Sequence, residues 1–249
     1  MALPDCRSAG AARFSGSLIG GMEISEIWRY PVKSMAGERV PSAQLGTRGL
    51  EGDRGIAAFD PGSRRPGHPV SARRLPGLLR FRARWEDGAV VVEGPDLPPT
   101  PWREKAVQER LADVCRRRLE LAEVDGGAFD DAPLHLVLLP SVAAVSAELG
   151  REVDKRRFRA NLFIAADGLM SGAERGWVGS QLAIGKVVLR VMAECPRCVV
   201  TTRDPDSHEQ WPALLRHLAA TREATMGVYA HVSDPGWVAL GDRLAASRA

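Results

Sequence analysis

The sequence predicts a β-rich α+β fold, and three observations lead to this prediction. Many short stretches are apolar or alternate between apolar and polar residues, as β-strands do. Only three stretches show the apolar spacing of a helix. Turn signals such as Asp60-Pro61-Gly62-Ser63 separate the strands at short intervals. Because helices do not alternate regularly with strands, we do not expect a parallel sheet built from βαβ units.

The first half of the chain is expected to consist mainly of strands. They are predicted at 22–30, 40–46, 56–59, 78–85 and 89–93, and the last two form a hairpin across 86–88. The proline-rich stretch 95–101 is expected to break the pattern, and 104–118 has helical spacing. Residues 1–21 are small, polar and glycine-rich without the apolar core of a signal peptide, so we expect a disordered extension.

The second half mixes strands with two short helices. Strands are predicted at 134–139, 158–164, 181–184, 186–193, 227–232 and 237–240. One helix is expected to start at Ser141 as its cap and to end near Leu149, and the other to cover 211–220. The turn Asp125-Gly126-Gly127 is a candidate boundary, which divides the chain into domains 22–125 and 126–249.

Composition excludes several classes of protein. The net charge of +3 over 249 residues is too small to favour nucleic-acid binding. No apolar run approaches the roughly 20 residues that a membrane span needs. Four cysteines do not make a disulfide framework, so we expect a reducing, cytoplasmic location.

The motif Cys195-Pro196-Arg197-Cys198 follows a predicted strand and allows three interpretations. A thioredoxin-like pair needs a following helix, whereas the β-branched residues 199–202 favour an extended chain. A zinc site needs four ligands, and no second such motif is present. A single thiolate can instead bind a soft metal, and the Arg197 guanidinium would favour the thiolate. The motif alone leaves these alternatives open.

Two further sequence features are suited to binding anions. Lys33 and Ser34 follow the first strand and offer a cation beside a hydroxyl. In the turn Gly52-Asp53-Arg54, the carboxylate could orient the guanidinium toward a phosphate.

Three residues of the predicted strands 134–139 and 158–164 are also of interest. Arg159 and Asn161 would point to the same face, where they could bracket a heterocycle. His135 lies in an apolar strand and is interpreted as a buried core residue with a satisfied ring.

A series of motifs in a fixed order extends over nearly the whole chain, and this order resembles the MOSC superfamily, named for the C-terminal domain of molybdenum cofactor sulfurase. The chain is most similar to its two-part members of the amidoxime-reducing type. The matching stretches are Tyr30-Pro31-Val32-Lys33-Ser34, Gly49-Leu50-Glu51-Gly52-Asp53-Arg54, Val70-Ser71-Ala72-Arg73, Phe158-Arg159-Ala160-Asn161, Trp177-Val178-Gly179, Cys195-Pro196-Arg197-Cys198 and Gly227-Val228-Tyr229.

The resemblance implies an N-terminal MOSC-associated β-barrel-like domain packed on a β-barrel MOSC domain. It implies that a molybdenum cofactor (Mo-molybdopterin) binds with Cys198 as the ligand of the metal. The residues that it assigns to cofactor binding are Lys33, Ser34, Arg54, Ser141, Arg159, Asn161, Pro196, Arg197 and Tyr229. Ser141 is included because it is the one hydroxyl that follows the strand 134–139.

The implied activity is a molybdenum-dependent oxidoreductase that reduces N-hydroxylated small molecules such as amidoximes or hydroxylamines. Its electrons would come from a separate donor protein, because no cysteine-rich electron-transfer segment follows. One alternative is a non-catalytic carrier of the cofactor or a sulfur-transfer protein that uses Cys198. Another is a zinc or thiol-redox module that uses Cys195 and Cys198.

Overall fold

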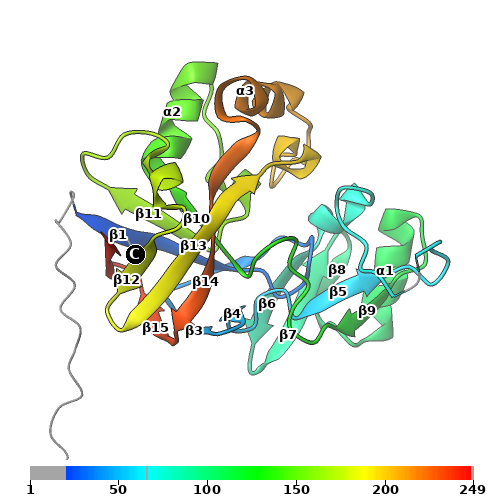
Figure 1. Cartoon of the computed structure of the whole chain (residues 1–249). Helices are drawn as coiled ribbons and strands as arrows, with labels where there is room; N and C mark the ends of the chain where they lie inside the picture. Colours follow the sequence, from blue (N-terminus) through cyan, green and yellow to red (C-terminus); the bar gives the residue numbers. More distant parts are fainter. Residues whose placement is uncertain (1–20, 66, 248–249) are drawn as a thin grey trace, which may run out of the picture.

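The computed structural model describes residues 21–65 and 67–247. The extension predicted at 1–21 therefore lies, apart from Gly21, outside the described residues. The chain forms two lobes side by side (Figure 1). One lobe is a barrel made mainly by the second half of the chain, and the other contains two small sheets and one α-helix.

The barrel is one mostly antiparallel sheet that closes on itself. Its strands follow the order β11-β10-β14-β13-β12-β16-β1, and the pairing of β1 with β11 completes the ring. The strands of this sheet, with β2 beyond the ring, are β1 (Met22–Arg29), β2 (Glu38–Val40), β10 (Leu134–Leu138), β11 (Leu162–Ala166), β12 (Gln181–Ile184), β13 (Val187–Pro196), β14 (Thr225–Asp234) and β16 (Arg243–Ser247).

Apolar side chains fill the barrel. Ile24, Leu136, Leu162 and Leu189 are at most 1% exposed and belong to one continuous core. Burial of these side chains drives closure, since a closed sheet has no free edge and shields its apolar face. The first strand of the chain thus completes a barrel whose other strands lie more than 100 residues later.

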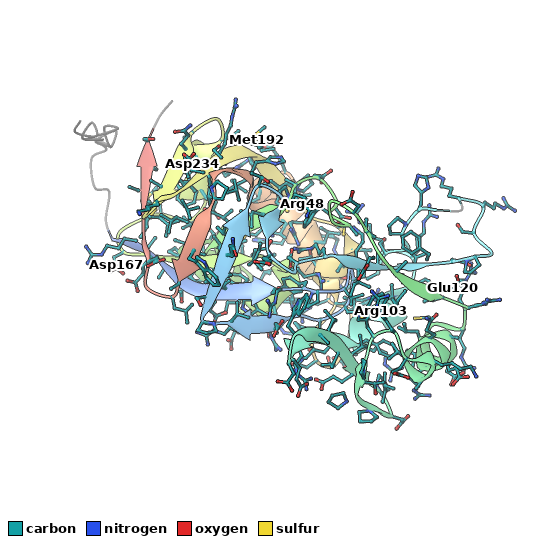
Figure 2. All side chains as sticks on the ribbon, turned by 90° about the horizontal axis from the view of Figure 1, so that it is seen from below. Arg48, Arg103, Glu120, Asp167, Met192 and Asp234 are labelled. Carbon is teal, nitrogen blue, oxygen red and sulfur yellow. The ribbon has the colours of Figure 1, made fainter. Side chains whose placement is uncertain are left out.

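The second lobe has its own core, centred on Phe81 and Leu111. Its sheets and helices are β5 (Ile56–Phe59) with β9 (Glu120–Glu123), the sheet β6 (Arg82–Glu86), β7 (Ala89–Gly94) and β8 (Leu97–Pro101), η1 (Pro76–Arg80) and α1 (Lys105–Cys115). A small sheet joins the lobes, since β3 (Ser42–Gly46) pairs with both β4 (Gly49–Leu50) and β15 (Gly236–Ala239). In the view of Figure 2, Met192 and Asp234 lie in the barrel lobe, while Arg103 and Glu120 lie in the other lobe.

Two helices cover the outside of the barrel (Figure 1): α2 (Leu139–Leu149) and α3 (Pro212–Arg222). They bury a third apolar cluster that includes Val145, Phe163 and Leu218. Three short 3₁₀ turns, η2 (Lys155–Phe158), η3 (Ala173–Trp177) and η4 (Val199–Thr202), connect the elements around them. No helix in the described ranges is long and apolar enough to cross a membrane.

The β-rich α+β prediction is confirmed, but several local predictions were wrong. The stretch 97–101 is a strand rather than a break, because β8 lies at the edge of its sheet, where prolines need not donate hydrogen bonds. The strand predicted from 78 starts only at Arg82, after a 3₁₀ turn. The strands β9 and β16 were not predicted at all.

Candidate functional site

The Cys-x-x-Cys motif lies at the end of β13, and its two thiols have different surroundings. Both are free; Cys195 is fully buried, whereas Cys198 is half-buried. The extended chain predicted after the motif is wrong, since residues 199–202 form the 3₁₀ turn η4. The turn is closed locally, with the Thr202 hydroxyl donating to the Val199 carbonyl over 2.7 Å. The motif nevertheless lies between antiparallel strands, which is not the βαβ setting of a thioredoxin-like pair.

Cys198 faces a cavity of about 750 Å³, which we call the Cys198 cavity. This volume includes the solvent at the mouth of the cavity. Its walls contain nine of the ten residues predicted for the site: Lys33, Ser34, Arg54, Arg159, Asn161, Pro196, Arg197, Cys198 and Tyr229. The first three come from the N-terminal half and the others from the C-terminal half. Segments distant in sequence therefore meet around one thiol.

Ser141 is the predicted site residue that the structure does not bring to this cavity. It lies inside the first turn of α2 and does not cap the helix, which begins two residues earlier, at Leu139. Its buried hydroxyl donates to Glu174 Oε2 over 2.7 Å and accepts from the Gly172 backbone N–H over 2.9 Å. Ser141, Gly172 and Glu174 all line a separate cavity beside α2.

Three cavity residues have left-handed backbone conformations, which non-glycine residues adopt rarely. They are Ser34 (φ 71°), Arg54 (φ 51°) and Arg159 (φ 54°). Conformations of this kind cost on the order of 1 kcal/mol each and tend to gather at functional sites. The prediction that Arg159 lies in a strand was wrong. Its left-handed turn after η2 lets its side chain reach the same cavity as Asn161.

The turn at Asp53 and Arg54 is organised as the sequence predicted. Asp53 is buried, accepts a hydrogen bond from the Tyr30 backbone N–H over 2.7 Å and forms an ion pair with Arg54. The Arg54 guanidinium also donates to Asn161 Oδ1 (3.3 Å) and to the Arg159 carbonyl (3.2 Å). Arg54 therefore ties the N-terminal half to the C-terminal half at the cavity wall.

Asn161 is fully buried and holds backbone groups of two barrel strands. Its Oδ1 accepts from the His135 backbone N–H over 3.2 Å, and its Nδ2 donates to the Trp28 carbonyl over 3.2 Å. With the contact from Arg54, the amide uses both of its polar ends inside the protein. Its role in this structure is to position the wall of the cavity.

The two cysteines have different guanidinium partners. Arg197 was expected to act on Cys198, but its Nη1 donates to Cys195 Sγ over 2.7 Å, and its Nη2 to the Phe158 carbonyl over 2.8 Å. Cys198 instead interacts with Arg73, which also lines the cavity: burial opposes the ionisation of Arg73, but the charges of Asp130 and Cys198 outweigh this effect and raise the pKa of Arg73. Arg73 belongs to one of the motifs of the resemblance, but it was not among the predicted site residues.

Five cations line the Cys198 cavity against one carboxylate: Lys33, Arg54, Arg73, Arg159 and Arg197 against Asp130. The carboxylate of Asp130 bridges Lys33 Nζ (2.7 Å) and Arg73 Nη2 (3.1 Å). Partial burial opposes its ionisation, but the hydrogen bond and charge of Lys33 outweigh this and lower the pKa of Asp130. The lining has an excess of positive charge, which favours an anionic ligand.

Neutral rings complete the walls. Burial lowers the pKa of His135 to about 3, with a further contribution from the charge of Arg197. Its Nε2 lies 2.9 Å from the Met226 carbonyl, so the interpretation of His135 as a buried, satisfied residue is confirmed. Burial and the neighbouring Cys195 raise the pKa of Tyr229. Neither ring is charged at neutral pH.

No group of three or more His, Cys, Asp or Glu side chains in the described ranges is arranged to hold a metal ion. The thiol of Cys198 is instead a single soft donor at the wall of a positively charged cavity. Such a donor set suits a group that brings its other metal ligands and its own negative charge.

Known proteins resemble this chain in fold or in sequence. The solved structure of the YUAD protein from Bacillus subtilis superposes with a TM-score of 0.50 at 13% identity, covering 91% of this chain and 95% of that one. The mitochondrial amidoxime reducing component 2 of Rattus norvegicus is 24% identical over 231 residues, covering 74% of this chain and 67% of the relative. The human mitochondrial amidoxime-reducing component 1 is 24% identical over 283 residues, covering 88% and 81%.

Two family descriptions account for nearly all of the described chain. The MOSC N-terminal beta barrel domain matches residues 21–131, and the MOSC domain matches residues 122–245. The matches agree with the order of the motifs and with the β-rich fold built around a barrel. The chain therefore belongs to the MOSC family and combines an N-terminal MOSC barrel domain with a MOSC domain.

Proposed function

We propose that this protein binds a molybdenum cofactor in the Cys198 cavity, with Cys198 as the protein ligand of the metal. The observation that carries the proposal is the free Cys198 thiol in a cavity with five cations and one carboxylate. Thiolates are preferred ligands of soft metals, and guanidinium and ammonium groups are preferred partners of phosphate. The residues present thus fit a group with a metal centre and a phosphate.

Each half of the chain has a part in this proposal. Lys33, Arg54 and Arg159 line the cavity, and in this proposal they would receive the phosphate and polar edges of the cofactor. Asn161 positions Arg54, and Tyr229 and Pro196 form walls of the cavity. When bound, the cofactor supplies two-electron redox chemistry, while the protein supplies orientation and charge.

The metal content of the purified protein tests the binding proposal. Cys198→Ala should abolish molybdenum retention after expression in a host that makes the cofactor. Cys115→Ala is a matched control, because Cys115 is also a free, partly buried thiol but lies in α1 of the other lobe. Equal molybdenum in the Cys198→Ala and control proteins, or none in the wild type, would contradict the proposal.

We further propose that the loaded protein reduces N-hydroxylated small molecules, as the names of the amidoxime-reducing relatives indicate for those proteins. Turnover of benzamidoxime with an artificial electron donor tests this step. A protein that retains molybdenum but reduces neither amidoximes nor hydroxylamines would be a carrier or sulfur-transfer protein instead.

The partner and location are also proposals. We propose a separate electron-donor protein and a cytoplasmic location, and a domain division into 22–125 and 126–249. Cell fractionation tests the location, since the names of the relatives point to mitochondria for those proteins.

A further inference from the structure

A second cavity, of about 540 Å³, lies between the two halves of the chain beside the Cys198 cavity. The two cavities share Arg159 and Val200 as lining residues. Five arginines line the second one, which we call the arginine cavity: Arg82, Arg156, Arg157, Arg159 and Arg203. Asp204 is the one carboxylate of its lining. Of its five arginines, the proposed function uses only Arg159.

Carboxylates neutralise two of the five arginines. Arg156 pairs with Asp154 and with Asp206, each over 2.6 Å. Arg157 pairs with Asp204 over 2.6 Å. These ion pairs use Asp154, Asp204 and Asp206, so they leave little negative charge for the other arginines.

Two of the remaining arginines, Arg159 and Arg203, have no carboxylate partner among the described residues. Arg82 has a long ion pair, with its Nη1 3.9 Å from Glu93 Oε1, beyond a normal hydrogen bond. The Arg203 guanidinium has one weak contact, 3.4 Å from the His208 carbonyl. Arg159 packs over the Tyr30 ring, 4.5 Å from its centroid, and its guanidinium donates no hydrogen bond within the described chain.

The pKa values of Arg159 and Arg157 reflect the cost of placing several guanidinium groups in one partly buried cavity. Burial lowers the pKa of Arg159 to about 10, and it also lowers the pKa of Arg157 in spite of Asp204. The Nε atom of Arg157 is buried and has no hydrogen-bond acceptor. Buried guanidinium groups that lack partners are costly, and an added anion would offset that cost.

We propose that the arginine cavity binds a small tetrahedral oxyanion of the phosphate or sulfate class, held by Arg159 and Arg203 with Arg82 at its rim. The three arginines come from three separate segments: Arg82 starts β6, Arg159 follows η2 and Arg203 follows η4. A tetrahedral oxyanion presents three or more acceptor oxygens to such a set of donors, whereas a carboxylate presents two. This site shares Arg159 with the molybdenum proposal, whereas Arg82 and Arg203 line the arginine cavity alone.

Trp28 gives the site a direct reporter. It lines the arginine cavity and not the Cys198 cavity, and its indole N–H donates to Glu26 Oε2 over 2.8 Å. In a ¹H–¹⁵N spectrum of the full chain, the six tryptophans give separate indole signals, and Trp28→Phe identifies the relevant one. Titration with inorganic phosphate should shift this signal in a saturable manner, and acetate at equal ionic strength should not.

Three variants locate the site. Arg203→Gln should weaken the phosphate effect on Trp28 at least tenfold, and Arg82→Gln, a change at a half-exposed side chain, should weaken it less. Lys33→Gln alters only the Cys198 cavity and should leave the effect intact. Arg190→Gln removes an exposed arginine of β13 and controls for net charge.

The proposal is overturned if phosphate causes no saturable shift of the Trp28 signal at millimolar concentration. It is also overturned if Lys33→Gln abolishes the shift while Arg203→Gln preserves it, because the anion would then bind only beside Cys198. Equal binding of acetate and phosphate would refute the tetrahedral class. Loss of molybdenum binding in Cys198→Ala would leave all three outcomes unaffected, because Cys198 does not line the arginine cavity, so the two proposals fail separately.

Discussion

Asn161→Ala is the substitution that most directly tests how the Cys198 cavity is built. The wild-type amide accepts from the His135 backbone N–H and from Arg54, and it donates to the Trp28 carbonyl. Alanine removes all three contacts without disturbing the backbone hydrogen bonds of residue 161 itself. Two backbone groups of barrel strands and one guanidinium then lose a partner.

The expected loss of stability follows from these contacts. A buried backbone group left without a partner costs about 1–3 kcal/mol, so two such groups cost roughly 2–6 kcal/mol. Arg54 keeps its ion pair with Asp53, so its lost contact adds little. For a chain of this size, each kcal/mol lowers the melting temperature by about 2–4 °C. We therefore expect a decrease of roughly 4–24 °C.

Thermal and urea unfolding of the purified variants measure this effect. Ser180→Ala is the matched control: it removes a buried hydroxyl that donates once, to the Trp177 carbonyl over 2.6 Å. The control should lose only about 1 kcal/mol. If Asn161→Ala is no less stable than Ser180→Ala, Asn161 does not hold the cavity wall together, and the reasoning from its hydrogen bonds is refuted.

Three further predictions concern the same region. Gly227→Ala should lower the free energy of unfolding in urea by over about 3 kcal/mol, because the residue has φ +75° and a methyl group would lie 2.3 Å from a carbonyl oxygen. The control Gly185→Ala (φ +57°) places its methyl group in open space and should cost about 1 kcal/mol. Equal losses of stability in the two variants would contradict the predicted clash. The pKa of His135 is about 3 in the folded protein, below its unfolded value of 6.5, so stability falls as pH falls through this range. Relative to His135→Gln, the wild type should lose up to about 1.4 kcal/mol per pH unit between pH 6 and 4, and parallel pH profiles would refute this. Tyr30→Leu should reduce molybdenum retention by removing the ring under Arg159, whereas Tyr30→Phe should keep it; equal metal contents would exclude such a role.

Much of the site could be predicted from the sequence because its chemistry resides in short motifs. The pairing of Asp53 with Arg54 depends on adjacent residues, and the structure confirms it. The β-rich character likewise follows from alternation and turn signals that are local in the chain. The burial of His135 followed from the apolar strand around it.

Other features depend on distances between segments, which a sequence does not contain. The closure of the barrel by β1 needs partners more than 100 residues away, and only the tertiary fold supplies them. The position of Ser141 beside Glu174, away from the cavity, is set by the packing of α2 against η3. The β-propensity of residues 199–202 also predicted the wrong conformation. These residues form the turn η4, which the hydrogen bond from the Thr202 hydroxyl to the Val199 carbonyl closes.

The sequence by itself determined the composition of the site: a thiol at 198, cations at 33, 54 and 159, and an amide at 161. Only the tertiary structure decided how they are used. It directs Arg197 to Cys195, places Arg73 on the wall of the Cys198 cavity, and leaves Arg159 and Arg203 of the neighbouring cavity without a carboxylate partner among the described residues. The physical reason is that residue types and spacing fix which groups can interact, whereas the direction of a long side chain depends on the packing and charges of every segment around it.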